Sequence, residues 1–310
     1  MIIAKRSFTA ITSKPFWYIY VIGIILLIVS GYLAYTKVYM SPQRVFWGMI
    51  SSSLQTEGVT IKTTEDTGST NVTQLVQFGL GPNDRARSLT TVRQGGTIIK
   101  TEIIGTNAAD YMRYRSITTD RKSSDGKPLN TSNIIGTWAK SDDSVQQSSS
   151  QASGHQLLAQ AVLGIGLPVG GVPVPIGNLT PKQRGDLMEW VKSENVYSPS
   201  FTSVKKTHKD GRLLYTYDTK IQTILYVRLM KEFAKDLGMH ELDSVDPNAY
   251  QTAQPIQVKL TVDARSRQLV GADAGQGYQQ TYEGYGLPLN VNLPTKTITI
   301  QELQARLSNL

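Results

Sequence analysis

The hydrophobic pattern of the chain begins with an apolar run over residues 15–36, which holds 22 residues and no charged side chain. As a helix rising about 1.5 Å per residue it would be roughly 33 Å long, close to the hydrocarbon thickness of a bilayer. Aromatic residues, which favour the membrane–water boundary, lie near both ends. They are Phe16, Trp17, Tyr18, Tyr20, Tyr32 and Tyr35. The pattern predicts a transmembrane helix over 15–36, embedded in the bilayer, followed by one domain over 42–310.

Basic residues beside this run predict its orientation. Lys5, Arg6 and Lys14 precede the run, whereas Lys37 and Arg44 follow it. The small excess of basic residues on the N-terminal side indicates that residues 1–14 are cytoplasmic and that the domain is extracytoplasmic. We therefore expect a single-pass signal-anchor protein of the cell membrane. A cleaved signal peptide is the alternative. Its apolar core is usually about 7–15 residues and ends in small residues of the A-x-A type, which this flank lacks.

After the membrane segment the pattern changes from helical to strand-like. Ser41 precedes a proline and a run of apolar residues at helical spacing, which predicts a helix that begins at residue 42 and is closed by Gly58. A period of two then extends over residues 59–140, and turn signals divide it. These signals lie at 81–84, 95–96 and 124–126. The region is predicted to be an antiparallel meander of five or six strands.

The second half of the domain mixes helices and strands. Helical patterns cover 181–194 and 224–237, and the second has the broad apolar side of a helix that lies on a sheet. Asp210-Gly211 predicts a hairpin turn between strands 201–209 and 213–221. Further strands are expected at 258–263, from 269 onward, at 278–285 and at 295–300, before a short helix over 301–307. The order predicts an α+β domain with a large antiparallel sheet of about ten strands.

Residues 164–177, GIGLPVGGVPVPIG, are unusual because they combine Gly and Pro with aliphatic residues only. The Gly and Pro content is incompatible with a helix, and no charge favours exposure to water. This segment is expected either to cover the mouth of a cavity or to pack on the core. The preceding polar residues 141–153 are expected to form a surface loop.

Composition excludes several classes of function. The formal net charge is +8, but residues 1–37 carry four of the 32 basic residues and no acidic residue, which leaves 28 basic and 24 acidic residues in the domain. No basic cluster typical of nucleic-acid binding occurs. Tyr111, Arg113, Arg115 and Ile117 are expected on one strand face, with the two arginines solvated, as for Lys205 and Lys206.

Candidate chemistry is sparse. The chain has no cysteine, so it has no disulfides, thiolate metal sites or lipidated N-terminal cysteine. The three histidines, His155, His208 and His240, lack a second ligand at metal-binding spacing. No nucleophile elbow or phosphate-binding loop is present. We therefore expect no enzymatic activity, no cofactor and no metal. The alternative is a hydrolase with an unusual site, in which carboxylates that are distant in the sequence meet in the folded chain.

The order of elements resembles the LolA-like lipoprotein-carrier superfamily, which includes lipid-binding envelope proteins of the LppX and LprG type. Four stretches carry the resemblance: 46–54 as the opening helix, 215–221 with the helix 224–237, 258–263 with 267–270, and 297–300 before the last helix. The resemblance implies a half-barrel in which a strongly curved antiparallel sheet wraps helices and encloses a cavity for acyl chains. Unlike the family, this chain has a membrane helix and no lipidated cysteine.

The function expected from these observations is binding of a hydrophobic ligand, such as a lipid, in a cavity enclosed by the sheet. Residues expected to contact the ligand are Leu167, Val169, Val172, Val174 and Ile176 from the Gly/Pro-rich segment, with Met230 and Phe233 in the wall. The alternative is that this segment and the helix 224–237 only fill the core, and that the protein is a structural or protein-interaction module of the cell envelope. The sequence does not identify the ligand, a protein partner or the oligomeric state.

Overall fold

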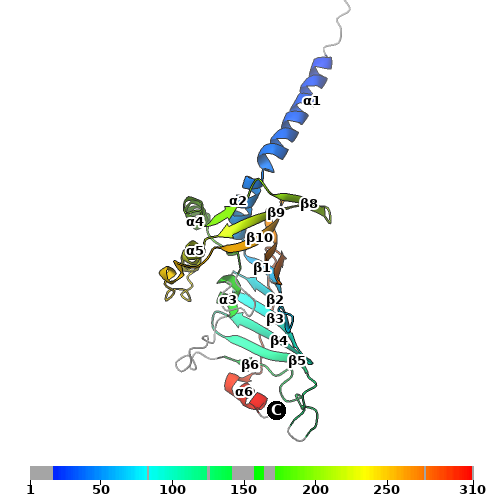
Figure 1. The fold of residues 1–310 in the computed structure, drawn as a ribbon, viewed down its shortest axis with the longest axis vertical. Coiled ribbons are helices and arrows are strands. Elements are labelled where there is room, and N and C mark those ends of the chain that lie inside the picture. Colours follow the sequence, from blue (N-terminus) through cyan, green and yellow to red (C-terminus); the bar gives the residue numbers. More distant parts are fainter. Residues whose placement is uncertain are drawn as a thin grey trace, which may run out of the picture.

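The computed structural model describes residues 17–81, 84–123, 126–141, 157–163, 172–275 and 277–308. The predicted cytoplasmic segment 1–14 and nearly all of the predicted loop 141–153 lie outside these residues. The chain forms an elongated structure in which one long helix extends from one end of a large sheet (Figure 1). Most helices gather at the end of the sheet nearest this long helix, and the last helix lies at the opposite end.

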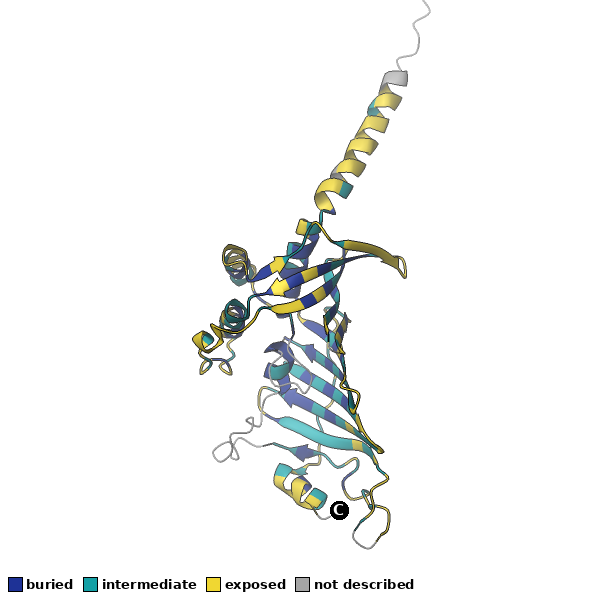
Figure 2. Cartoon of the chain, viewed as in Figure 1, coloured by how far each residue is buried: buried dark blue, intermediate teal, exposed yellow. Residues whose placement is uncertain are grey.

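The long helix, α1 (Trp17–Leu33), continues through a π-helical segment, η1 (Ala34–Tyr39). The stretch Tyr20–Tyr39 is long and apolar enough to span a membrane, and none of it is buried against the rest of the protein. Its side chains are largely exposed, as Figure 2 shows. The helix therefore extends three residues beyond the predicted end at residue 36, since nothing that breaks a helix occurs before Ser41-Pro42.

Helix α2 (Pro42–Ser53) follows after only two residues, Met40 and Ser41, and begins where the pattern predicted. It ends at Ser53, earlier than predicted, and Gly58, the residue predicted to close it, is the first residue of strand β1 (Gly58–Asp66). Ser41 has the extended backbone of an N-cap residue, and Pro42 occupies the first helical turn. The buried side of α2 includes Phe46, whose ring centroid lies 5.2 Å from that of Tyr217 and 5.9 Å from that of Phe201. The long apolar helix is thus joined directly to a helix of the hydrophobic core.

The predicted meander is confirmed. Its strands are β1 (Gly58–Asp66), β2 (Thr70–Gly79), β3 (Arg85–Gln94), β4 (Thr97–Thr106), β5 (Asp110–Thr118) and the short β6 (Ala139–Lys140). Neighbouring strands pair antiparallel in order. A bulge beside Thr101 shifts the register of β4 and β5. Because of this bulge Ile117 pairs with Ile99 and Arg113 pairs with Glu102, so the two residues do not share a face as predicted.

The second half of the chain supplies seven more strands. They are β7 (Tyr197–Pro199), β8 (Lys205–Lys209), β9 (Arg212–Ile221), β10 (Ile256–Asp263), β11 (Gln268–Gly275), β12 (Tyr278–Glu283) and β13 (Ile298–Thr299). The hairpin between β8 and β9 turns at Asp210-Gly211 as predicted, although β8 begins later than expected. Within the described residues the sheet has 13 strands in the order β13-β6-β5-β4-β3-β2-β1-β12-β11-β10-β9-β7, with β8 beside β9.

The sheet is mixed, which corrects the prediction of a purely antiparallel one. Strand β13 runs parallel to β6, with Ile298 opposite Ala139. The chain reaches this position through residues 284–297, which pass Gly58, Gly79 and Arg85 at one end of the strands before joining the far edge. A long connection of this kind permits a parallel pair, which a hairpin cannot form. The sheet is open, because β13 and β7 lie at opposite ends of the strand order.

The remaining helices are α3 (Leu157–Leu163), α4 (Pro181–Ser193), α5 (Thr223–Asp236), the 3₁₀ turn η3 (Pro247–Tyr250) and α6 (Ile300–Ser308). The predicted helix start at Thr180 is confirmed: its hydroxyl accepts from the Gln183 amide, and the Gln183 side chain accepts from the Thr180 amide. Helices α2, α4 and α5 enclose the main hydrophobic core with the sheet. A smaller core around Ile134, Ala139 and Leu303 lies under α6.

Candidate apolar binding site

An apolar cavity of about 250 Å³ lies between the sheet, helix α5 and the described end of the Gly/Pro-rich segment. Strands β9 to β12 supply its floor, Tyr226 of α5 one wall, and residues 172–173 another. The lining residues are Val172, Pro173, Ile221, Tyr226, Ile256, Val258, Ala272, Ala274, Tyr278 and Gln280. The lining is almost entirely carbon, so water gains few hydrogen bonds inside it.

Small residues line the cavity on its β11 side. Ala272 lies opposite Leu260 on one side and Gln280 on the other, and Ala274, at an irregularity of the β11–β12 pairing, also lines the cavity. Both alanines and Tyr226 of α5 line the cavity. A cavity of about 150 Å³ with aliphatic walls accepts benzene, and typical small-molecule pockets occupy about 300–1,000 Å³. The observed cavity is suited to one apolar chain or ring.

Two buried tyrosine hydroxyls hold the segment that covers the cavity. Tyr226 donates to the carbonyl oxygen of Val172, and Tyr197 donates to that of Pro173 at 3.0 Å. Burial, reinforced by neighbouring tyrosine hydroxyls, raises the pKa of both side chains above the ordinary value of 10.0. Both hydroxyls therefore stay protonated at neutral pH and remain hydrogen-bond donors.

The same segment is fixed at its other end to helix α2. The amide of Gly177 donates to the Ser53 carbonyl at 3.1 Å, and that of Leu179 donates to the Leu54 carbonyl at 2.9 Å. There is no room for a side chain at Gly177, because a Cβ atom there would lie 2.6 Å from the Phe233 ring. Residues 172–179 are therefore a well-anchored wall.

The polar atoms at the cavity are largely satisfied by each other. The Gln280 side-chain amide donates to the Tyr278 hydroxyl at 2.6 Å, and its oxygen accepts from Tyr282 at 2.5 Å. Burial raises the pKa of both tyrosines, so neither ionises at neutral pH. A ligand at this site would be recognised mainly through apolar contact, with at most one polar group near Tyr278.

The residues predicted to contact a ligand occupy three different environments. Leu167 and Val169 lie outside the described residues. Val172 lines the cavity. Val174, Ile176, Met230 and Phe233 are buried in the main core and are not among the lining residues.

Sequence reasoning missed most of the lining. Alternation along 256–262 indicated an inward face for Val258, and the broad apolar side of α5 included Tyr226, but neither pattern shows that these residues face an empty space. Two of the lining residues are the alanines at 272 and 274, and alanine in a strand is equally consistent with close packing.

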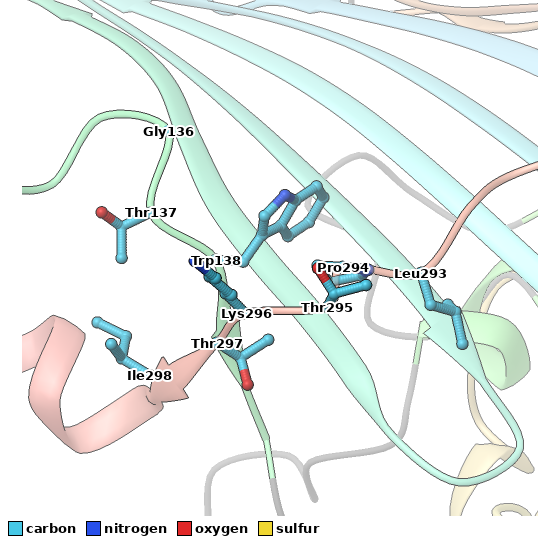
Figure 3. A pocket seen from close by; sticks show the side chains of 9 residues that line it. All are labelled: Gly136, Thr137, Trp138, Leu293, Pro294, Thr295, Lys296, Thr297 and Ile298. Carbon is cyan, nitrogen blue, oxygen red and sulfur yellow. The ribbon is translucent and has the colours of Figure 1, made fainter.

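A second hollow, a groove of about 550 Å³, lies near the other end of the sheet and has mixed polarity. Two chain segments line it, residues 136–138 and 293–298. Figure 3 shows the indole of Trp138 lying alongside the segment that carries Leu293 and Pro294. The Arg113 guanidinium stacks on this indole, 4.5 Å from its centroid.

A buried carboxylate, Glu102 of β4, lies between arginines of the two neighbouring strands, Arg87 of β3 and Arg113 of β5. Only 3% of the Glu102 side chain is exposed, and its oxygens lie 2.6 Å from Arg87 Nη2 and 2.5 Å from Arg113 Nη2. Arg115 lies farther away, at 3.9 Å. Burial alone would raise the pKa of Glu102, but the hydrogen bonds and charges of Arg113 and Arg87 outweigh it, and the pKa is lower than 4.5. Glu102 is therefore an ionised structural residue.

No arrangement typical of metal or acid–base chemistry occurs in the part of the chain that the structure describes. Groups of three or more His, Asp or Glu side chains positioned to hold a metal ion are absent from these residues. His240 pairs with Asp243 at 2.9 Å, but both side chains are mostly exposed. No family model and no curated protein matches the chain.

We predict that Tyr226→Phe lowers the free energy of unfolding by about 1–3 kcal/mol, because the buried Val172 carbonyl loses its donor while the cavity keeps its shape. Tyr197→Phe is expected to act similarly through Pro173. The measurement is denaturant unfolding of the detergent-solubilised protein. The matched control is Tyr250→Phe at an exposed position, and a loss no larger than that of the control would contradict the assigned hydrogen bonds.

Proposed function

We propose that this protein is a single-pass, membrane-anchored protein whose extracytoplasmic domain binds an apolar ligand, such as a lipid chain. The observation that carries the proposal is the cavity between β9–β12, α5 and residues 172–173, because its lining is apolar, its covering segment is anchored, and it opens to solvent beside Ile256 and Ala274. An apolar group that enters gains about 25 cal/mol for each Å² removed from water. The cavity does not require a cofactor.

Two further features support this proposal. The exposed apolar surface of α1 is suited to lipid contact, and its direct connection to α2 keeps the domain beside the membrane. An open sheet with helices over one part of it is also the arrangement expected from the resemblance to the LolA-like superfamily. A half-barrel that holds acyl chains remains part of the proposal.

The test is photolabelling of the full-length protein in nanodiscs with a medium-chain fatty acid that carries a diazirine. We expect label in two places: on α1, from probe dissolved in the bilayer, and on peptides that contain Ile221, Val258 or Tyr278. Ala272→Leu adds a side chain inside the cavity and should reduce cavity labelling about tenfold, since filling the space removes the favourable burial. Label on α1 alone would overturn the proposal.

A matched control separates loss of the cavity from loss of folding. Ala253→Leu makes the same chemical change at an exposed position and should leave both sites labelled. Labelling of α1 should be equal in all variants and serves as an internal standard.

A second candidate function is a protein-interaction module that uses the groove at residues 136–138 and 293–298. The Arg113–Trp138 stack favours it, because arginine and tryptophan are enriched among the residues that dominate interface energies. Trp138→Ala distinguishes the two functions: it should leave cavity labelling unchanged while reducing capture of a protein partner.

A further inference from the structure

The hairpin formed by β8 and β9 is strongly basic and projects from the sheet. Residues 205–212 read KKTHKDGR, with four permanent cations and a single carboxylate, Asp210. Every residue of β8 is exposed, and so is Arg212. The strand pairs only with β9, so its outer edge is free in the described part of the chain. Exposed lysines on an edge also discourage pairing with another strand.

This hairpin lies beside the end of the membrane helix. Figure 1 shows β8 projecting just below α1. The Tyr215 hydroxyl donates to the Met40 carbonyl at 3.0 Å, and the Tyr217 hydroxyl donates to that of Pro42 at 2.9 Å. Lys206 pairs with Tyr215, and its ammonium group lies 4.9 Å from the centroid of that ring. The first cations of the hairpin are therefore held next to the residues that leave the membrane segment.

A second turn brings further positive charge to the same place. The amide of Ala264 donates to the Leu213 carbonyl at 2.9 Å, which fixes the β10–β11 turn beside β9. Arg267 of this turn stacks on Tyr39, the last residue of η1, at 4.3 Å from its centroid, and Arg265 is exposed. The nearby carboxylate of Asp263 is buried and accepts hydrogen bonds from the turn amides, so it faces inward.

We propose that a cluster of five exposed basic residues binds anionic lipid headgroups of the membrane that holds α1. This cluster, the basic collar, consists of Lys205, Lys206, Lys209, Arg212 and Arg265. This inference rests on the proposed anchoring of α1. The collar is tethered at the level where headgroup phosphates lie, so its effective concentration at the surface is high. Each basic side chain near an anionic surface strengthens binding about fivefold, and the attraction acts within a Debye length of about 8–10 Å.

The absence of cysteine from the chain allows a direct test, because Thr207→Cys provides a unique labelling site at the hairpin. The full-length protein carries a fluorophore there and is placed in nanodiscs of phosphatidylcholine alone, or with phosphatidylglycerol in a three to one ratio. Both contain a lipid with a quencher on its headgroup. We expect strong quenching only in the anionic discs, and less of it at high salt.

Neutralising the collar should remove this difference. In Lys206→Gln the ratio of bound to unbound hairpin, read from the quenched fraction, should fall about fivefold. The variant K205Q/K206Q/K209Q/R212Q, which leaves only Arg265 of the collar charged, should reduce quenching close to the level of the neutral discs. The control variant R93Q/K100Q/R121Q/K122Q removes the same number of charges from exposed residues of the distant meander. This variant should retain the strong quenching in anionic discs.

The outcomes separate the inference from the function on which it rests. Equal quenching in neutral and anionic discs, or an equal loss in the two fourfold variants, would overturn lipid binding by the collar while the anchor stands. A chain that does not co-elute with the nanodiscs would overturn the anchor and the collar together. Quenching that disappears only when a protein partner is removed would assign the collar to that partner.

Discussion

Replacing Phe46 with alanine is expected to lower the free energy of unfolding by about 3–5 kcal/mol, the usual range for truncating a fully buried phenylalanine. Phe46 has no exposed surface and makes edge-on contacts with Tyr197, Phe201 and Tyr217. These residues come from strands and a loop that are distant in the sequence, so the cavity left by alanine cannot be closed by a local shift.

The measurement is equilibrium unfolding in urea, followed by tyrosine and tryptophan fluorescence. Phe46→Leu keeps most of the volume and should cost less than half as much as the alanine variant. Tyr250→Ala removes an aromatic ring from an exposed site and should change stability by less than about 0.5 kcal/mol. If Phe46→Ala behaved like Tyr250→Ala, the packing of α2 on the sheet would be wrong.

The second large effect is expected from Glu102→Gln, which should cost about 2–3 kcal/mol. Breaking a buried ion pair from one side costs about 3–5 kcal/mol, and the partial exposure of Arg87 and Arg113 lowers that figure. The matched control is Glu302→Gln in α6, where an exposed Glu–Arg pair at i,i+4 spacing is worth about 0.3–0.5 kcal/mol.

The pH dependence gives an independent check on Glu102. Its pKa in the folded protein is below the ordinary value of 4.5, so the folded state binds the proton less tightly than the unfolded state. The stabilisation is therefore fully present above that value and is lost as the pH falls through the lowered pKa. The stability difference between wild type and Glu102→Gln should be constant near neutral pH and shrink in acid. A difference that grows in acid would contradict the assignment.

Local patterns predicted those elements whose folding depends on nearby residues. Ser41-Pro42 and Thr180-Pro181 predicted the starts of two helices. The period of two predicted the strands of the meander, and Asp210-Gly211 predicted the turn of a hairpin. The parallel pairing of β13 with β6 was not predictable, because it depends on the path of residues 284–297 and not on the two-residue strand itself.

The burial of Glu102 and the presence of the cavity could not be predicted from the sequence, for a related reason. A period of two places Glu102 on the polar side of its strand, but arginines from two neighbouring strands cover it, and the bulge beside Thr101 brings Arg113 of β5 opposite it. The cavity likewise lies between residues of different elements, among them Ala272 of β11 and Tyr226 of α5. In both cases the property belongs to a pair of distant segments, which a single-sequence pattern does not identify.

The strand order also determines when the sheet is completed during synthesis. Strand β1 forms near the start of the domain, yet its outer partner is β12, with Thr60 opposite Glu283. The other edge of the meander, β6, is covered only by β13. A ribosome must therefore finish almost the whole chain before either edge of the nascent meander is capped. Until then both edges are open to pairing with other polypeptides, so a holding chaperone is expected to be most important late in translation.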